Sequence, residues 1–149
     1  MKTINKTIEA ISDEMGNQCI GVRVRLLNRV ITNIYDEALR PLGITNNQIS
    51  ILTSMVSKGF STPGEIGHFL QMQKSTLSRN FDRMRKKGWL VILTGDDARS
   101  QRLRVTAKGK SVVKNSWPLW RSAQTKAKQM LGEVGATSVC DAADGIWSK

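Results

Sequence analysis

A basic segment between Gln73 and Lys87 carries the side chains of this sequence best suited to binding a charged ligand. It holds six Lys or Arg residues against one Asp. Drawn as a helix, the segment places Leu77, Phe81 and Met84 on one apolar stripe. The opposite arc is polar and consists of Ser75, Arg79, Asp82, Arg83 and Lys86, with Lys74 and Thr76 near the N-terminal end. A helix of this kind fits the major groove of DNA, where hydroxyl and guanidinium groups reach base edges and phosphates.

The charge of the whole chain agrees with a polyanionic partner. The 149 residues carry a formal net charge of +11, and the excess is concentrated over residues 74–110. Double-stranded DNA is therefore the expected partner. An acidic membrane surface would match the charge but not its arrangement on a helix followed by a hairpin. The N-terminal residues lack a secretory signal, and no run approaches the roughly 20 apolar residues of a membrane span. We expect no membrane association and a cytoplasmic location.

The sequence offers little for catalysis or metal binding. Cys19 and Cys140 are far apart and form neither a disulfide framework nor a metal-ligand spacing. His68 is the only histidine, and we interpret it as a structural or surface residue. There is no nucleophile–base pair and no phosphate-binding loop. We therefore expect no enzyme, no metal and no cofactor, with both thiols normally reduced.

Capping signals predict the helices that position the basic segment. Thr45 and Gln48 form a capping box that opens a helix ending at Gly59. A second start signal over residues 62–65 (Thr-Pro-Gly-Glu) opens a short helix through Leu70. About three residues then lead into the basic helix. Two helices joined in this way, with the second one basic, form a helix-turn-helix.

A predicted β-hairpin follows the basic helix. Residues 89–94 (WLVILT) are apolar and β-branched, residues 95–98 form a turn cluster, and residues 102–106 alternate polar and apolar side chains. The hairpin tip carries Arg99 and Arg102. We interpret the Asp96–Asp97 pair as support for this turn. A hairpin in this place is the wing of a winged helix-turn-helix, so the predicted fold class is mainly α with a small β-wing.

Long helices flank this domain. A marginal amphipathic helix is expected over residues 3–15, ended by Gly16. Residues 17–40 repeat apolar side chains in a heptad-like seam at Ile20, Val24, Leu27, Ile31, Ile34 and Ala38, widened by Leu26 and Val30. A final helix capped by Thr106 is expected to kink at Pro118 and to break at Gly132 and Gly135. Its expected buried residues are Val112, Val113, Trp117, Trp120, Ala123, Ala127, Met130 and Leu131. We divide the chain into dimerisation helices (1–42), the winged helix-turn-helix domain (43–110) and C-terminal dimerisation helices (111–149).

This order of elements resembles the MarR (multiple antibiotic resistance regulator) family of bacterial transcription factors over residues 17–149. The basic segment reads STLSRNFDRMRKKGWL and the wing reads DDARSQRLRVTAKGK. The most specific part of the likeness is the wing pattern from Asp97 to Gly109, in which Val105 replaces the usual Leu before Thr106. Gln73 also departs from the family, whose members often place Asp or Ser as N-cap at this position.

The resemblance implies roles for individual residues. Those that face the major groove would be Ser75, Thr76, Ser78, Arg79 and Arg83. Arg99 at the wing tip would enter the minor groove, and Asp97 would brace the wing through an Arg. With Lys74 and Arg102 added for their charge, these are the predicted DNA-binding and wing-supporting residues.

The resemblance also implies a homodimer whose first and last helices interlock and which binds a pseudo-palindromic operator. Trp117 and Trp120 would line a cleft for a small aromatic effector, although as tryptophans they are first of all core and interface material. We therefore expect a sequence-specific transcriptional regulator, a repressor released by a small molecule.

Two alternatives remain open. Cys19 lies near the start of the long helix, where peroxide-sensing members of the family keep a reactive cysteine, so its oxidation could shift the dimer. Those sensors surround the thiol with tyrosines, whereas Tyr35 is the only tyrosine here, and Cys140 is interpreted as packing. The other alternative is a protein-interaction module that docks through the winged helix and does not bind DNA.

Overall fold

The computed structural model describes residues 6–94 and 101–148 of the chain. These residues form two compact units, residues 1–33 and residues 34–149, and the boundary between them falls within one helix. Each unit is described by itself. In the described part of the chain, no helix is long and apolar enough to cross a membrane, and no three His, Cys, Asp or Glu side chains are grouped to hold a metal ion.

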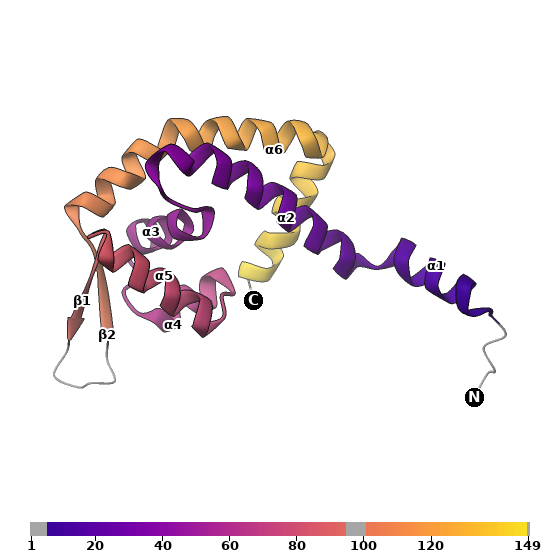
Figure 1. Ribbon diagram of the computed structural model, residues 1–149, viewed down its shortest axis with the longest axis horizontal. Coiled ribbons are helices and arrows are strands. Elements are labelled where there is room, and N and C mark those ends of the chain that lie inside the picture. The colour runs from indigo at the N-terminus through magenta and orange to yellow at the C-terminus, as the bar shows by residue number, and fades with distance from the viewer. Residues whose placement is uncertain (1–5, 95–100, 149) are drawn as a thin grey trace. The chain divides into compact units, whose positions relative to one another are not determined.

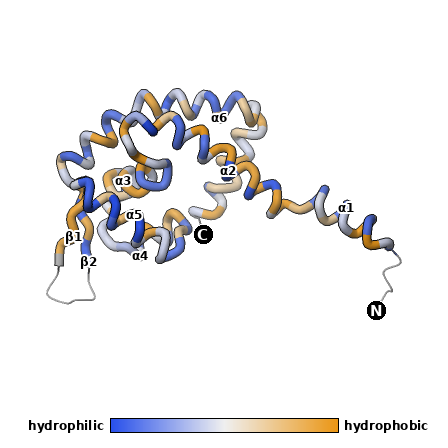
Figure 2. Tube along the Cα trace, in the orientation of Figure 1, coloured by the Kyte–Doolittle hydropathy of each residue, from blue (hydrophilic) through white to orange (hydrophobic). Residues whose placement is uncertain are grey.

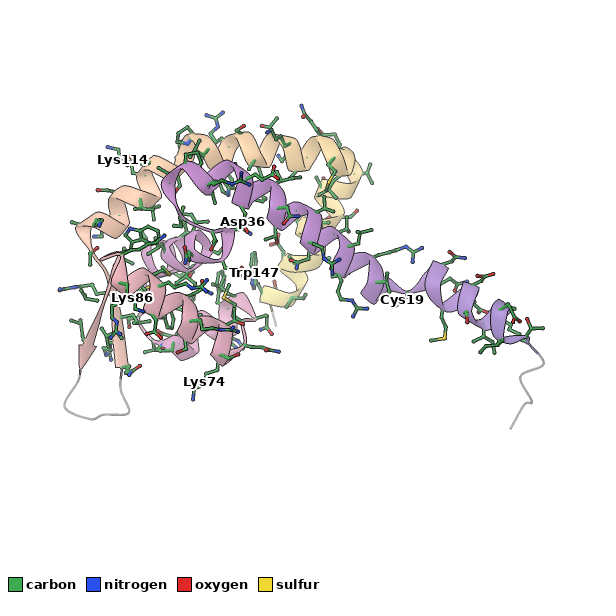
Figure 3. The ribbon with its side chains drawn as sticks, viewed as in Figure 1. Cys19, Asp36, Lys74, Lys86, Lys114 and Trp147 are labelled. Atoms are coloured by element: carbon green, nitrogen blue, oxygen red, sulfur yellow. The ribbon has the colours of Figure 1, made fainter. Side chains whose placement is uncertain are left out.

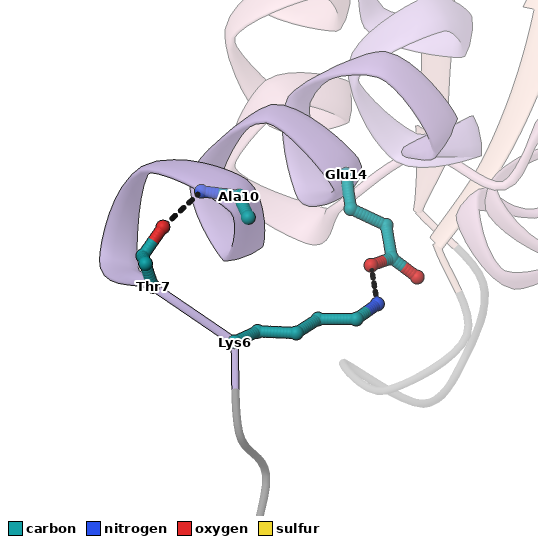
Figure 4. Close-up of polar contacts among 4 residues, drawn as sticks. All are labelled: Lys6, Thr7, Ala10 and Glu14. Atoms are coloured by element: carbon teal, nitrogen blue, oxygen red, sulfur yellow. Dashed lines mark hydrogen bonds and ion pairs between the residues drawn. The ribbon is translucent and has the colours of Figure 1, made fainter.

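The first unit consists of helix α1 (Ile8–Gln18) and the first part of α2 (Ile20–Leu39). Thr7 caps α1 by accepting a hydrogen bond from the Ala10 amide, and Lys6 pairs with Glu14 (Figure 4). The prediction that Gly16 ends the first helix was wrong. The helix runs through Gly16, which costs only about 1 kcal/mol in an exposed helix, and ends at Cys19.

The first part of α2 leaves much of its predicted seam exposed, although Leu27 and Ile31 are half-buried. Ile20 is 75% exposed and Val24 57% exposed, and Leu26 and Val30 are exposed as well. Hydrophobic residues are frequent along this stretch of the tube in Figure 2. Among the described residues of the first unit, none buries these four side chains.

The second unit contains the end of α2, a 3₁₀ turn (Arg40–Leu42) and helices α3 (Asn46–Lys58), α4 (Pro63–Leu70) and α5 (Lys74–Lys86). Strands β1 (Leu90–Thr94) and β2 (Gln101–Val105) pair antiparallel, with Leu90 opposite Val105 and Thr94 opposite Gln101. Helix α6 (Ala107–Trp147) completes it. Figure 1 shows α3, α4 and α5 grouped beside the two strands. The mainly α fold with a small β-wing is confirmed.

A single hydrophobic core holds the second unit together. The fully buried side chains Leu39, Ile51, Leu52, Ile66, Met84 and Leu90 come from α2, α3, α4, α5 and β1. Burying a side chain of this size contributes roughly 1.5–3 kcal/mol. The core therefore fixes α5 against α3 and α4 from its apolar side.

The start of α6 is locked to the strands. The Thr106 hydroxyl donates to the Gly88 carbonyl (2.6 Å) and accepts from the Gly109 amide (3.0 Å), and the Thr106 amide donates to the Trp89 carbonyl (3.0 Å). Gly109 is buried, and a Cβ there would overlap the Trp89 carbonyl oxygen and lie 2.8 Å from Val105 Cγ1. Only glycine therefore fits at this junction.

The expectations for α6 are confirmed in part. The backbone leaves helical geometry at Gly132 (φ 70°, ψ 164°), as predicted, whereas the predicted break at Gly135 is wrong because the helix continues through it. Pro118 lies inside the helix, and the kink expected there stays a prediction. Trp117 and Met130, expected to be buried, are 58% and 43% exposed. Cys140, interpreted as a packing residue, is exposed. After Gly132 the chain brings Trp147 to α4, where its Nε1 donates to the Phe69 carbonyl (2.9 Å) and its ring stacks on Phe69 at 5.1 Å.

Candidate nucleic-acid interface

Helix α4 is capped by its own sequence. The Thr62 hydroxyl accepts from the Glu65 amide, and the Glu65 carboxylate accepts from the Ser61 and Thr62 amides at 3.0 and 2.9 Å. These backbone hydrogen bonds, with smaller effects from the Thr62 hydroxyl and Arg102, lower the pKa of Glu65 below its ordinary 4.5. The predicted capping boxes at Thr45 and Thr62 are both confirmed.

The turn between α4 and α5 is tight. Gln71 adopts a left-handed conformation (φ 49°), which is uncommon for a residue with a side chain. Its amide and that of Met72 donate to the His68 and Gly67 carbonyls at 3.3 and 3.0 Å. A Cβ on Gly67 would lie 3.3 Å from Leu77 Cδ2, so α4 and α5 approach closely at this point. The predicted helix-turn-helix is confirmed.

Helix α5 buries the predicted apolar stripe. Leu77, Phe81 and Met84 are buried, and Asn80 joins them by donating its side-chain amide to the Thr76 carbonyl (2.9 Å). The N-terminus lacks a side-chain cap, because the Gln73 side chain makes no capping hydrogen bond. Gln73 is therefore the weak N-cap that the sequence indicated.

The opposite side of α5 is exposed and basic. The predicted DNA-binding residues that lie exposed on it are Lys74, Ser75, Ser78, Arg79 and Arg83, while Thr76 is half-buried. Figure 3 labels Lys74 and Lys86 near the two ends of this helix. The Arg79 Nε donates to the Ser75 carbonyl (3.2 Å), so the side chain lies along the helix. Asp82 pairs with Arg85 at 3.6 Å.

A polar cavity adjoins the exposed face of α5. Its volume is about 240 Å³, and its lining residues are Asp36, Thr45, Asn47, Thr76, Arg79, Asn80 and Arg83. Asp36 accepts a hydrogen bond from the Asn46 amide (2.6 Å) and thereby fixes the first turn of α3. Asn47 was not among the residues predicted from the sequence. The capping box at Thr45 places Asn47 in the first turn of α3, but its position beside α5 depends on tertiary packing.

The wing extends the basic surface. Arg102 and Arg104 of β2 are exposed, whereas Leu103 between them is buried, as the period of a strand requires. The Leu103 amide donates to the Ser61 carbonyl (2.6 Å), which ties β2 to the segment before α4. Arg99 and Asp97, predicted for the minor groove and for wing support, lie outside the described residues.

The remaining predicted residues lie on other elements. Trp117 and Trp120 stack on each other on α6, with ring centroids 5.5 Å apart, and Arg121 lies over Trp117. Cys19 belongs to the first unit. It is half-buried at the end of α1 and lines an open hollow of about 630 Å³ with Ile11 and Met15.

Comparisons with known proteins give this site a family. The MarR family model matches residues 42–100. The crystal structure of the M. tuberculosis transcriptional regulator MosR in complex with DNA is similar with a TM-score of 0.72 and 30% identity, over 86% of this chain and 96% of that one. The chain belongs to the MarR family. A mutant MarR from E. coli, complexed with operator DNA, shares the fold with a TM-score of 0.75 and 20% identity, over 89% of this chain and 96% of that one.

Curated relatives match a shorter stretch. The multiple antibiotic resistance protein MarR of Salmonella typhimurium is 29% identical over 94 residues, 62% of this chain and 65% of that protein. The uncharacterized HTH-type transcriptional regulator YwoH of Bacillus subtilis is 30% identical over 73 residues, 49% of this chain and 53% of that protein. This chain thus spans less than two thirds of either relative.

Proposed function

We propose that this chain is a sequence-specific DNA-binding transcriptional regulator that acts as a homodimer and represses its genes until an effector releases it. The observation that carries the proposal is the exposed basic face of α5, held outward by a buried apolar face and followed by a basic wing. Membership of the MarR family supports it. Two proteins of this fold, MosR and a mutant E. coli MarR, have been crystallised in complex with DNA.

Each part of the interface has a distinct role in this proposal. The Lys and Arg side chains neutralise phosphates and set affinity and its salt dependence, while Ser75, Ser78 and Arg79 read base edges in the major groove. Arg102 and Arg99 bring the wing to the neighbouring minor groove, with Asp97 bracing the wing. The double-stranded operator is pseudo-palindromic because a two-fold dimer presents two copies of α5.

The uncovered seam of α2 supports the homodimer. Side chains such as Ile20 and Val24 are exposed on this helix, and a second copy of the chain would bury them. In this proposal residues 1–42 and 111–149 form the dimer, residues 43–110 bind DNA, and Trp117 and Trp120 face the small-molecule effector. The regulator would act in the cytoplasm, where the operator DNA is.

The decisive experiment compares Arg79→Ala with wild-type protein on operator and scrambled DNA. The DNA upstream of the gene, searched for an inverted repeat, supplies the probe. We expect Arg79→Ala to lose about 1–3 kcal/mol on the operator and much less on the scrambled duplex. Lys58→Ala, an exposed charge change at the end of α3 outside the residues assigned to DNA or to the dimer, should leave both unchanged. Equal losses on both duplexes would contradict base reading by Arg79.

A salt titration separates DNA binding from a protein-docking role. A protein that neutralises several phosphates must lose affinity steeply as salt rises, because binding releases condensed counterions. Elution from a DNA column at low salt, with no such dependence, would favour the protein-interaction module.

A thiol-based redox regulator is the second candidate, and the position of Cys19 favours it. Its backbone leaves helical geometry between α1 and α2 (φ −67°, ψ 108°), and its side chain is half-buried. Oxidation to a sulfenic acid there would place a polar group against Met15 and Ile11. Cys19→Ser should abolish peroxide-induced release from DNA, and unchanged release would reject the redox role.

A further inference from the structure

The C-terminal end of α5 is closed by the sequence Lys87-Gly88-Trp89. Gly88 adopts a left-handed conformation (φ 73°), and its amide donates to the Arg85 carbonyl (2.9 Å). The Trp89 amide donates to the Met84 carbonyl, also at 2.9 Å. This pair of hydrogen bonds is the Schellman motif, which often ends a helix at a glycine. The motif turns the chain directly after Lys87 and brings the buried Trp89 ring beside the Lys87 side chain.

The Lys87 ammonium has two partners at this junction. It donates a hydrogen bond to the Gly43 carbonyl, and it lies over the Trp89 ring, 4.6 Å from the ring centroid. Gly43 follows the 3₁₀ turn between α2 and α3 in a left-handed conformation (φ 62°), and Trp89 directly precedes β1. A cation over an indole face is attracted by the ring quadrupole, and an ammonium on a carbonyl is a charge-assisted donor. Lys87 therefore joins the α2–α3 turn, the end of α5 and the root of the wing.

Lys87 differs in position from the other cations of the basic segment. Arg83 and Lys86, three residues apart, lie on the exposed arc of α5. Lys87 is exposed as well, but it follows three residues after Met84 and seven after Asn80, both of which are buried. This spacing places Lys87 on the flank of the helix that packs against the core. Its charge is thus used within the winged-helix unit and not on the surface assigned to DNA.

We propose that Lys87 is a positioning residue for operator binding, which sets the direction of α5 and of the wing without contacting DNA. This inference rests on the proposed DNA-binding function. The core holds α5 from its apolar side, and the turn after α4 holds its N-terminal end. Lys87 holds the C-terminal end, and through Trp89 it ties that end to the hairpin that carries Arg102. Base readout requires side chains at set distances from base edges, so freeing this end of α5 lowers operator affinity.

The junction is tested first in the free protein by NMR. The ring current of Trp89 should move the Lys87 ε-methylene protons upfield of those of Lys86. Lys87→Ala should shift the amide of Ile44, which shares a peptide bond with the Gly43 carbonyl that Lys87 contacts. Lys86→Ala is the matched control, because it removes the same charge from the neighbouring exposed residue and should leave the Ile44 amide unchanged. Equal shifts of Ile44 in both variants, or ε-methylene protons of Lys87 at the position of those of Lys86, would overturn the junction.

The positioning role is tested on operator DNA over a series of salt concentrations, with each variant shown to be folded by circular dichroism. We expect Lys87→Ala to bind the operator at least about fivefold more weakly than wild type with an unchanged salt slope, because no phosphate contact is lost. Lys74→Ala, a change in a residue assigned to DNA, should instead lower the slope by about one. A slope lowered by about one in Lys87→Ala would make Lys87 a phosphate ligand and overturn the proposal. Unchanged operator affinity would overturn it as well.

A conservative variant separates positioning by the cation from a general loss of packing. Lys87→Arg keeps a cation that can stack on the Trp89 ring and donate to the Gly43 carbonyl, so we expect operator affinity within about twofold of wild type. Lys87→Met keeps the apolar stem without the charge and should bind the operator as weakly as Lys87→Ala. An equal loss of affinity in Lys87→Arg and Lys87→Ala would overturn the role of the cation.

The two measurements separate failure of this inference from failure of the proposed function. If wild-type protein binds the operator and Lys87→Ala binds it equally well, the positioning role is overturned and the proposed function stands. If wild-type protein shows no operator binding at all, the proposed function and the positioning role fail together, while the NMR result still decides whether Lys87 joins the three segments.

Discussion

The two units of this chain differ in how they dispose of their apolar side chains. The second unit buries them around Ile51, Leu52 and Met84, and its helices α3 and α4 begin at capping boxes of their own. The first unit leaves Ile20 and Val24 exposed and buries no residue of α1. The second unit therefore contains its own stabilising core, whereas the first unit needs a packing partner to bury its apolar side chains. Under the proposed function, that partner is a second copy of the chain.

Gly109→Ala should give the largest change in unfolding free energy, and it tests whether the second unit is stabilised by its own contacts. The new Cβ would overlap the Trp89 carbonyl oxygen and crowd Val105, so we expect a loss of about 3 kcal/mol in unfolding free energy. Denaturant unfolding measures it. Gly145→Ala, where a Cβ meets nothing within 4 Å, is the control and should gain up to about 1 kcal/mol. Equal stabilities for the two variants would mean that the backbone at the Thr106 junction shifts enough to accommodate the new Cβ without a measurable loss of stability.

The complementary test acts on the first unit. Val24→Asp places a charge on the exposed seam, so we expect dimer association to weaken by about 3 kcal/mol, roughly a hundredfold. Sedimentation over a concentration series measures association, and the unfolding of the second unit should not change. Asn33→Asp, exposed on the opposite face of α2, serves as the control for added negative charge. A dimer that survives Val24→Asp unchanged would place the interface elsewhere.

A smaller effect is expected at the start of α5, the one described helix of the helix-turn-helix without a side-chain cap. The Gln73 backbone (φ −64°, ψ 144°) already suits an N-cap. Gln73→Ser should therefore raise the unfolding free energy by about 1 kcal/mol, while Gln73→Ala should change it little, since Gln73 makes no capping bond. If Gln73→Ser gives no gain, the first turn of α5 is held by packing alone.

The smallest effect is the acid response of Glu65. Its folded-state pKa lies below the ordinary 4.5 because backbone amides donate to its carboxylate. The stability that it contributes is thus present above the unfolded-state pKa and is lost as pH falls through the folded-state pKa. Unfolding measured at neutral and acidic pH should show Glu65→Gln with less loss of stability in acid than wild type. Parallel curves would contradict a functioning capping box.

The sequence predicted the second unit well because its signals are local. Thr45, Thr62 and Thr106 cap helices by bonds within three residues, and the alternation around Leu103 identifies a strand directly. The predicted strand ends are within one residue of the observed ones. The exposed face of α5 follows from the apolar stripe alone.

Where the sequence misled, the deciding physics was not local. Glycine has a low helix propensity, but the cost of about 1 kcal/mol at Gly16 is too small to end a helix by itself. Gly132 and Gly135 both permit a break, but of the two only Gly132 leaves helical geometry, on the path that brings Trp147 to Phe69. The exposure of Trp117 depends on tertiary packing, which a sequence pattern does not contain. The cavity shared by Asp36, Asn47 and Arg79 arises from segments distant in sequence.

The junction at Thr106 makes the wing and α6 a single mechanical part. The Thr106 hydroxyl bonds both the Gly88 carbonyl before β1 and the Gly109 amide in the first turn of α6. The helix packs so closely against the hairpin that even a Cβ on Gly109 would overlap Trp89 and Val105. The first turn of α6 and the base of the hairpin therefore move together as one rigid part. A rotation of α6 between this junction and the break at Gly132 would tilt the strands, because the contacts at Thr106 and Gly109 leave no room for the helix to move alone.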